Sequence, residues 1–218
     1  MTTSTIILPS IPPTPTGSPK GFTIRARRPE DMPQLCDLLG RQQPGSKYPI
    51  VWPLPMPVPE FIEREGEVAA FVAEKADTNH VVGHVSVCRL VTSDHIDDGL
   101  GPTWAAAYGC KEDQLRIIGV LFTDPTFAGK GVGSALMDAA TELASSGNNK
   151  AALDCLDTNV TALNFYLRRG WKIIGEWRDA PWLPAGSKSV VHLLILDEDK
   201  AKVRTNGAGD GAVENGRQ

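Results

Sequence analysis

The feature that most constrains this chain is a run with three glycines in five positions, Gly129, Gly131 and Gly133. An apolar strand pattern precedes the run at residues 115–123, and a helical pattern follows it at residues 132–145. Glycine lets a backbone approach a ligand closely. The first amides of a helix have no partner within the helix, and the helix dipole adds positive charge there. A strand, a glycine loop and a helix start in this order therefore indicate a pyrophosphate-binding loop.

Two common phosphate-binding loops match this run poorly. A P-loop requires Ser or Thr directly after its lysine, but Gly131 stands there. A dinucleotide-binding loop requires its glycines directly after the strand. Here Pro125 lies between strand and glycines, and Ser134 replaces the third glycine. Because Asp154 ends the next apolar run, as in a dinucleotide-binding unit, an NAD-dependent oxidoreductase stays an open alternative.

Residues 123–134 resemble motif A of the GCN5-related N-acetyltransferases, V-x-P-x-(Y/F)-(R/Q)-G-x-G-x-(G/A). The stretch here reads T-D-P-T-F-A-G-K-G-V-G. Thr123 replaces the usual Val, and Ala128 replaces the usual Arg or Gln, although it keeps the backbone amide through which that position largely acts. The resemblance implies that the loop binds the pyrophosphate of acetyl-CoA. The loop residues assigned to this cofactor are Ala128, Gly129, Lys130, Gly131, Val132, Gly133 and Ser134.

Residues 159–171 resemble motif B of the same family, N-x-x-A-x-x-(L/F)-Y-x-x-x-G-(F/W). Their spacing predicts a helix that ends at Gly170. The resemblance implies that Asn159 hydrogen-bonds the pantetheine arm of the cofactor and that Ala162 and Phe165 also bind it. An asparagine at this position is equally suited to capping the helix. The two motifs stand in the family's order and separation, and the resemblance covers residues 21–198.

Acetyl transfer to an amine requires a polarised thioester carbonyl, a deprotonated amine and a proton for the leaving thiol. Tyr166 falls on the family's tyrosine position, so the resemblance implies that it is the general acid. A tyrosine pKa near ~10 is close enough to that of a thiol for this role. The resemblance also implies that backbone amides near Leu121, Phe122 and Thr123 bind the cofactor and polarise its carbonyl.

No motif supplies the general base. Ile117 occupies the strand position where several family members have a glutamate. The candidates left open are a chain of water molecules and the side chains of Glu112, Asp113, His84, His95 and Asp154. His84 lies in a strand pattern, where a histidine is commonly half-buried. Because the strand carboxylate is missing, a non-catalytic acyl-CoA-binding or sensor protein on the same fold is a second alternative.

The expected acceptor is a primary amine of a small molecule. In the resemblance, the segment after the first helix and the loop before the last strand cover the acceptor. The substrate-binding residues assigned are Tyr48 and Trp52, Trp182, and also Trp104, with plain packing of these aromatics as an equally open alternative. An acidic cluster at residues 94–98 would favour a cationic amine, although such clusters are often simply solvated.

Composition narrows the class of protein further. The net charge of −4 argues against general nucleic-acid binding. No apolar run reaches the length of a membrane span, and from the residues before the domain we expect no secretory signal. The four cysteines lack metal-site spacing, which favours a reducing, cytoplasmic location. We expect a flexible leader at residues 1–20, one acetyltransferase domain at 21–198 and a disordered tail at 199–218. The oligomeric state, monomer or homodimer, stays open.

The order of periodic segments predicts an α/β (α+β) fold with a mixed, mostly antiparallel central sheet flanked by helices. We expect strands at residues 22–26, 68–73, 81–90, 115–123, 151–156, 171–177 and 190–196. A first helix opens near residue 29, residues 40–59 are expected to be irregular, and residues 60–67 form a short helix. Residues 104–108 are expected to form one helical turn, followed by helices at 132–145 and 160–169.

Overall fold

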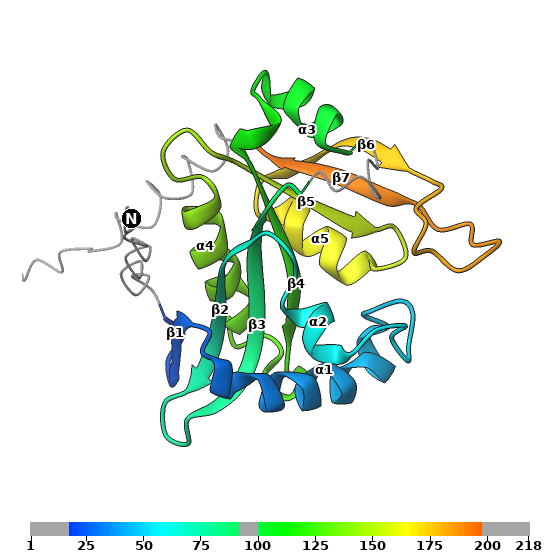
Figure 1. Ribbon diagram of the computed structural model, residues 1–218. Helices are drawn as coiled ribbons and strands as arrows, with labels where there is room; N and C mark the ends of the chain where they lie inside the picture. The colour runs from blue at the N-terminus through cyan, green and yellow to red at the C-terminus, as the bar shows by residue number, and fades with distance from the viewer. Residues whose placement is uncertain (1–17, 92–99, 198–218) are drawn as a thin grey trace, which may run out of the picture.

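The computed structural model describes residues 18–91 and 100–197. They form a seven-stranded sheet in the order β1-β2-β3-β4-β5-β7-β6, with helices on both sides (Figure 1). All neighbouring strands are antiparallel except β4 and β5, so the mixed, mostly antiparallel sheet is confirmed. The strands are β1 (Phe22–Ala26), β2 (Glu67–Lys75), β3 (His80–Arg89), β4 (Leu115–Thr123), β5 (Lys150–Leu156), β6 (Trp171–Trp177) and β7 (Val191–Leu196).

Three groups of buried apolar side chains attach the helices to this sheet. The main core lies between α4 and the sheet, with buried residues from all seven strands, and α5 packs at its edge. The second lies under α1 and α2, where Leu35, Leu38 and Leu39 are fully buried. The third lies under α3. The α-helices are α1 (Met32–Ser46), α2 (Val58–Ile62), α3 (Leu100–Tyr108), α4 (Val132–Ala144) and α5 (Val160–Arg168).

The two parallel strands, β4 and β5, part soon after they meet. Their pairing runs from Leu115 opposite Lys150 to Ile117 opposite Ala152. Beyond that point β4 continues to Thr123 and β5 to Leu156, but they no longer pair. The sheet therefore opens along the carboxyl-terminal halves of both strands, and the open edge of β4 leads directly to the glycine loop.

Strand β4 also carries a β-bulge beside this opening. Ser86 of β3 pairs with Gly119, and His84 pairs with Phe122, so Val120 and Leu121 share one position opposite Val85. Val120 has a φ of 51°, which is rare for a β-branched residue. A bulge re-aims backbone groups that a regular ladder would direct at the neighbouring strand.

Most expected elements are confirmed, and three boundaries are wrong. Helix α1 continues through residues 40–46, because buried Gln42 donates a 2.6 Å hydrogen bond to the Tyr48 carbonyl and anchors the last turns. The short helix is Val58–Ile62 rather than 60–67, and α3 is longer than one turn. The expectations for residues 1–17, 94–98 and 198–218 lie outside the described residues.

Candidate active site

The glycine loop joins β4 to α4, and two of its glycines have left-handed backbones. Gly129 has a φ of 74° and Gly131 a φ of 82°, a region that glycine adopts readily. Gly131 is the N-cap of α4. Within the described chain, the first three helical amides, those of residues 132–134, have no backbone acceptor outside the helix. Together with the helix dipole they form a positively polarised end that suits an anion.

Asp124 organises the short turn that separates β4 from the glycines. Its Oδ1 accepts hydrogen bonds from the Thr126 amide at 2.9 Å and the Thr126 hydroxyl at 2.6 Å. Burial alone would raise the pKa of Asp124, but the hydrogen bonds from Thr126 and Arg41 outweigh burial and lower that pKa. The Ala128 amide donates to the Pro125 carbonyl at 3.1 Å, so in this structure it supports the turn itself.

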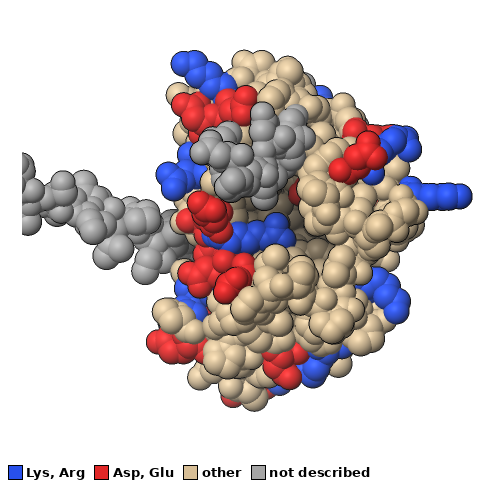
Figure 2. Space-filling view, turned by 45° about the vertical axis from the view of Figure 1, so that its right-hand side comes forward, with Lys and Arg blue, Asp and Glu red and all other residues tan. Residues whose placement is uncertain are grey.

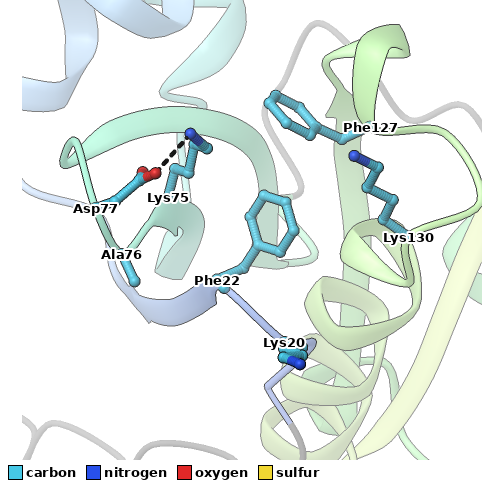
Figure 3. Close-up of a pocket in the computed structure, with 8 residues that line it drawn as sticks. Lys20, Phe22, Lys75, Ala76, Asp77, Phe127 and Lys130 are labelled. Carbon is cyan, nitrogen blue, oxygen red and sulfur yellow. Dashed lines mark hydrogen bonds and ion pairs between the residues drawn. The ribbon is translucent and has the colours of Figure 1, made fainter.

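A shallow pocket of about 280 Å³ lies beside the loop (Figure 3). Three lysines line it, and one of them, Lys75, forms a 2.8 Å ion pair with Asp77. Lys20 and Lys130 form no ion pair with any residue in the described ranges. The Lys130 ammonium lies 5.4 Å from the centre of the Phe127 ring. The pocket therefore adds unneutralised positive charge to the positively polarised loop.

Tyr166 lies on α5 next to strand β5. Its ring packs edge-on against Phe165 and Trp171, with centroid distances of 5.5 and 6.5 Å. Burial raises the pKa of the Tyr166 hydroxyl well above its ordinary range, and negative charge on Cys155, Tyr48 or Asp154 would raise it further. The hydroxyl therefore stays protonated at neutral pH.

Two groups on other elements act electrostatically on Tyr166. Tyr48 comes from the segment between α1 and α2, and its ring lies 6.0 Å from that of Phe61. Burial raises the pKa of Tyr48 to about 12. Asp154 is exposed near the carboxyl end of β5, and its charge acts on both tyrosines. The fold thus gathers a protonated phenol and a carboxylate where β4 and β5 have separated.

Motif B forms the predicted helix, α5. The Asn159 side chain caps it by accepting a 3.2 Å hydrogen bond from the Ala162 amide. Gly170 follows the helix with a φ of 88°, as the spacing predicts. Ala162 and Phe165 pack against the main core, and the Arg169 guanidinium lies 5.2 Å from the Phe165 ring centre. Their contacts with a cofactor stay predictions.

The segments expected to cover the acceptor lie on one side of the molecule (Figure 1). Trp52, between α1 and α2, is 37% exposed, and Trp182, between β6 and β7, is 41% exposed. Figure 2 turns this side forward and shows a hollow with Lys or Arg atoms at its floor and Asp or Glu atoms along one rim. These aromatics are therefore available to a ligand.

The assignment of Trp104 to the acceptor site is wrong. Trp104 is 2% exposed and lies in the third core with Leu115, Ala152 and Leu193, because α3 presses it onto the sheet. Its indole ring packs there together with Leu100 and Ala105 of the same helix.

The structure also shows which of the candidate bases lie near the opening between β4 and β5 and which do not. Glu112 and Asp113 lie just before β4, at the opposite end of the strand from the glycine loop. His84 is fully buried rather than half-buried, and burial lowers its pKa to about 4. Both of its ring nitrogens have protein partners. His95 lies outside the described residues. Asp154, exposed near the carboxyl end of β5, is the remaining side-chain candidate whose charge acts on Tyr166, and a chain of water molecules stays the other alternative.

These features together define an acyltransferase-type site, with an anion-binding loop beside a bulged strand and an opened sheet. The model of the acetyltransferase (GNAT) family matches residues 32–171, and the chain belongs to that family. A GCN5-related N-acetyltransferase from Kribbella flavida is similar in fold, with a TM-score of 0.58, 16% identity and coverage of 82% of this chain and 98% of the other.

Two further solved structures share the fold. The ribosomal-protein-S18-alanine N-acetyltransferase from Escherichia coli has a TM-score of 0.55 and 15% identity, covering 80% of this chain and 92% of its own. Arabidopsis thaliana NAA60, solved with acetyl-CoA, has a TM-score of 0.56 and 15% identity, covering 80% and 97%. No curated protein matches the sequence.

The fold removes the oxidoreductase alternative, because a dinucleotide-binding unit requires a parallel sheet and β4 has only β5 as a parallel neighbour. In the described ranges, no three His, Cys, Asp or Glu side chains cluster in a way that could hold a metal ion. None of the helices found there is long and apolar enough to cross a membrane.

Proposed function

We propose that the protein transfers acetyl from acetyl-CoA to the primary amine of a small molecule, by direct attack in a ternary complex. The observation that carries this proposal is the alignment of three features along one path. The positively polarised start of α4 lies next to the open edge of β4, and Tyr166 lies on α5, which packs against β5 on the other side of the opening. A pyrophosphate, a pantetheine arm and a thioester follow one another in the same order.

The diphosphate of the cofactor binds the glycine loop and the first amides of α4. Lys20 and Lys130 supply compensating charge from the pocket beside the loop. The pantetheine arm extends into the opening between β4 and β5, where unpaired strand edges offer hydrogen-bonding groups. Asn159, at the start of α5, borders the opposite side of this path.

The acceptor amine enters from the side of Tyr48 and the two exposed tryptophans. Its nitrogen attacks the thioester carbonyl carbon and forms a tetrahedral intermediate, whose oxygen is stabilised by β4 amides near Leu121. Asp154 takes the proton of the amine, directly or through water. The carbon–sulfur bond then breaks, and Tyr166 donates its proton to the departing sulfur. Burial keeps the Tyr166 hydroxyl protonated, so the proton is present when negative charge develops on the sulfur, although the raised pKa also makes this hydroxyl a weaker acid than a solvent-exposed tyrosine.

Thermal melting with acetyl-CoA, and separately with NAD, tests the first step. A ligand at a hundred times its Kd stabilises the folded state by about 2.7 kcal/mol, so we expect the melting temperature to rise by several degrees with acetyl-CoA alone. A rise with NAD alone would contradict the proposal. Release of free CoA with a panel of small amines then tests turnover. Binding without turnover across that panel would favour the non-catalytic alternative, which the missing strand carboxylate at Ile117 motivates.

A further inference from the structure

Strand β3 places two polar side chains beneath the bulge of β4, where neither contacts solvent. His84 and Ser86 both have 0% exposure. The Ser86 hydroxyl donates to the Gly119 carbonyl at 3.1 Å, and His84 Nδ1 lies 3.0 Å from the Val120 carbonyl oxygen. Two successive carbonyls of β4, that of Gly119 just before the bulge and that of Val120 within it, thus each have a β3 side chain as partner.

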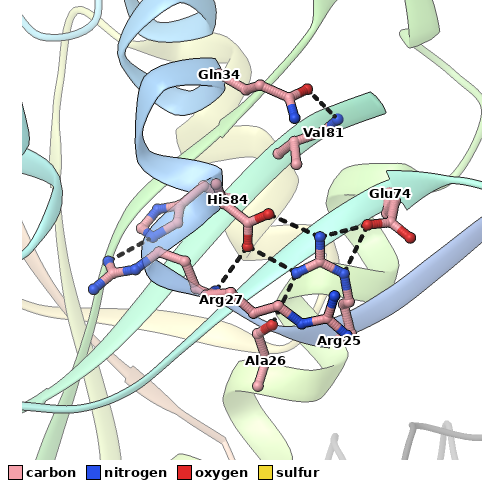
Figure 4. A network of polar contacts seen from close by, with 9 residues as sticks. Arg25, Ala26, Arg27, Gln34, Glu74, Val81 and His84 are labelled. Atoms are coloured by element: carbon pink, nitrogen blue, oxygen red, sulfur yellow. Dashed lines mark hydrogen bonds and ion pairs between the residues drawn. The ribbon is translucent and has the colours of Figure 1, made fainter. Parts of the chain in front are cut away.

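The protonation of His84 follows from its second partner. Arg27 Nη1 lies 3.3 Å from His84 Nε2 (Figure 4). A guanidinium has only donors, so Nε2 must accept and Nδ1 must carry the proton that it donates to Val120. Arg27 is itself fixed by Glu67, to which its two terminal nitrogens donate at 2.8 and 3.1 Å. The chain of contacts from Glu67 to Val120 therefore has one consistent set of donors and acceptors.

Holding these carbonyls also aims two amides. In a trans peptide the N–H points away from the C=O of the same unit. The Gly119 carbonyl is drawn toward β3, so the Val120 amide turns away from β3. The Val120 carbonyl is drawn toward His84, so the Leu121 amide turns away as well. The pairing of β4 with β5 ends at Ile117, before Val120 and Leu121. These two amides are therefore directed toward the opening between the strands.

We infer that His84 and Ser86 are positioning residues that hold the Val120 and Leu121 amides in place for the thioester carbonyl. This inference rests on the proposed acetyl transfer. The left-handed φ of Val120 is the reason such support is needed, because a β-branched residue disfavours that conformation. Without the two side-chain donors, the bulge would relax toward a regular strand and re-aim its amides.

The test compares four variants. His84→Leu removes the donor to Val120, whereas His84→Asn keeps a donor at the same distance from the backbone. Ser86→Ala removes the donor to Gly119 with little change in volume. Val87→Ala is the matched control, because it leaves a cavity in the main core on the same strand, where Val87 pairs with Ile118 outside the bulge. The reporter is the infrared absorption of bound acetyl-CoA labelled with ¹³C at the thioester carbonyl, read beside kcat and the Kd for acetyl-CoA.

In the wild-type protein we expect the labelled carbonyl to absorb at lower wavenumber when bound than when free. His84→Leu and Ser86→Ala should each lose part of this shift and lower kcat about 10- to 100-fold, with a Kd changed less than about 3-fold. His84→Asn should restore most of the shift and of kcat relative to His84→Leu. Val87→Ala should lower the melting temperature while keeping the shift.

Two results separate the inference from the function on which it rests. If the wild-type protein binds acetyl-CoA with a shifted carbonyl and His84→Leu and Ser86→Ala keep that shift, the positioning role is wrong and the transferase proposal stands. If acetyl-CoA does not bind the wild-type protein, the transferase proposal itself fails. Equal loss of shift in His84→Leu and Val87→Ala would attribute the effect to general destabilisation and overturn the inference.

Discussion

The Arg41 guanidinium lies 3.3 Å from the Asp124 carboxylate, although 83 residues separate them in the chain. Arg41 belongs to α1, and Asp124 begins the turn before the glycine loop. The contact therefore ties helix α1 to the turn that precedes the glycine loop.

Replacing Asp124 with Ala should destabilise the loop. The variant loses the hydrogen bonds to Thr126, and the loss of such a cap lowers the free energy of unfolding by about 1–2 kcal/mol. We expect weaker acetyl-CoA binding as well, because the glycines lose their support. Urea unfolding and calorimetry measure the two effects. Arg41→Gln is the control, with an expected effect below about 1 kcal/mol because the arginine is half-exposed. Equal effects of the two variants would contradict a capping role for Asp124.

Tyr166→Phe should lower kcat about 10²- to 10⁴-fold while leaving the Kd for acetyl-CoA nearly unchanged. The ring contacts with Phe165 and Trp171 are kept, so the fold should be intact. Single-turnover kinetics and calorimetry separate the two quantities. Unchanged turnover would rule out an essential proton from this hydroxyl.

Asp154→Asn should lower kcat most strongly near neutral pH and partly recover as the pH rises. The amide keeps the shape of the carboxylate but takes no proton, so only amine that is already deprotonated in solution reacts. The measurement is kcat/KM against pH for the wild-type protein and the variant, with Asp113→Asn as the control at the other end of β4. Identical profiles for the wild-type protein and Asp154→Asn would exclude the carboxylate as the base.

The buried His84 should make the stability depend on pH. Burial lowers its pKa from 6.5 to about 4; the positive charge of Arg27 acts in the same direction, while the Val120 carbonyl and Asp31 oppose it. Between these values the unfolded chain binds the extra proton, so stability is full above pH 6.5 and falls as the pH drops toward 4. The loss should reach about 3 kcal/mol.

Urea unfolding of the wild-type protein and His84→Asn at neutral and acidic pH checks this contribution. The carboxylates that also titrate are the same in both proteins, so the difference between them isolates the histidine. If both lose the same stability on acidification, His84 is not the group responsible.

Replacing Lys20 and Lys130 together with Gln should weaken acetyl-CoA several-fold and flatten the salt dependence of its binding. S-acetylpantetheine lacks the nucleotide and should bind both proteins equally, which makes it the matched ligand control. If the double variant lost the same affinity for acetyl-CoA and for S-acetylpantetheine, these lysines would not contact the phosphates.

The backbone geometry of the glycine loop and the start of α5 were largely predictable from sequence, because glycine spacing, a capping asparagine and a strand-to-helix order are local signals. The bulge was not. Nothing about Val120 signals a left-handed backbone, since its φ is imposed by the register between β3 and β4. The contact of His84 with the Val120 carbonyl depends on the same register, so the positioning role inferred for His84 could not be predicted from the sequence.

Other differences have similar causes. Helix α1 passes through Pro44 and two glycines that argue against a helix locally, and buried Gln42 overrides them through a contact with Tyr48. The residues around Trp104 in the sequence do not distinguish a tryptophan of an exposed pocket from one in the core. Trp104 is buried because α3 packs against the sheet.

The short pairing of β4 with β5 has one more consequence. A four-strand half and a three-strand half of the sheet are joined along only three residue pairs. A small rotation about this seam would widen or narrow the opening, so its width is set partly by whatever lies inside. A molecule that contacts both halves would restrict this rotation. Amide protons on the facing strands should then exchange with solvent more slowly than in the protein without that molecule.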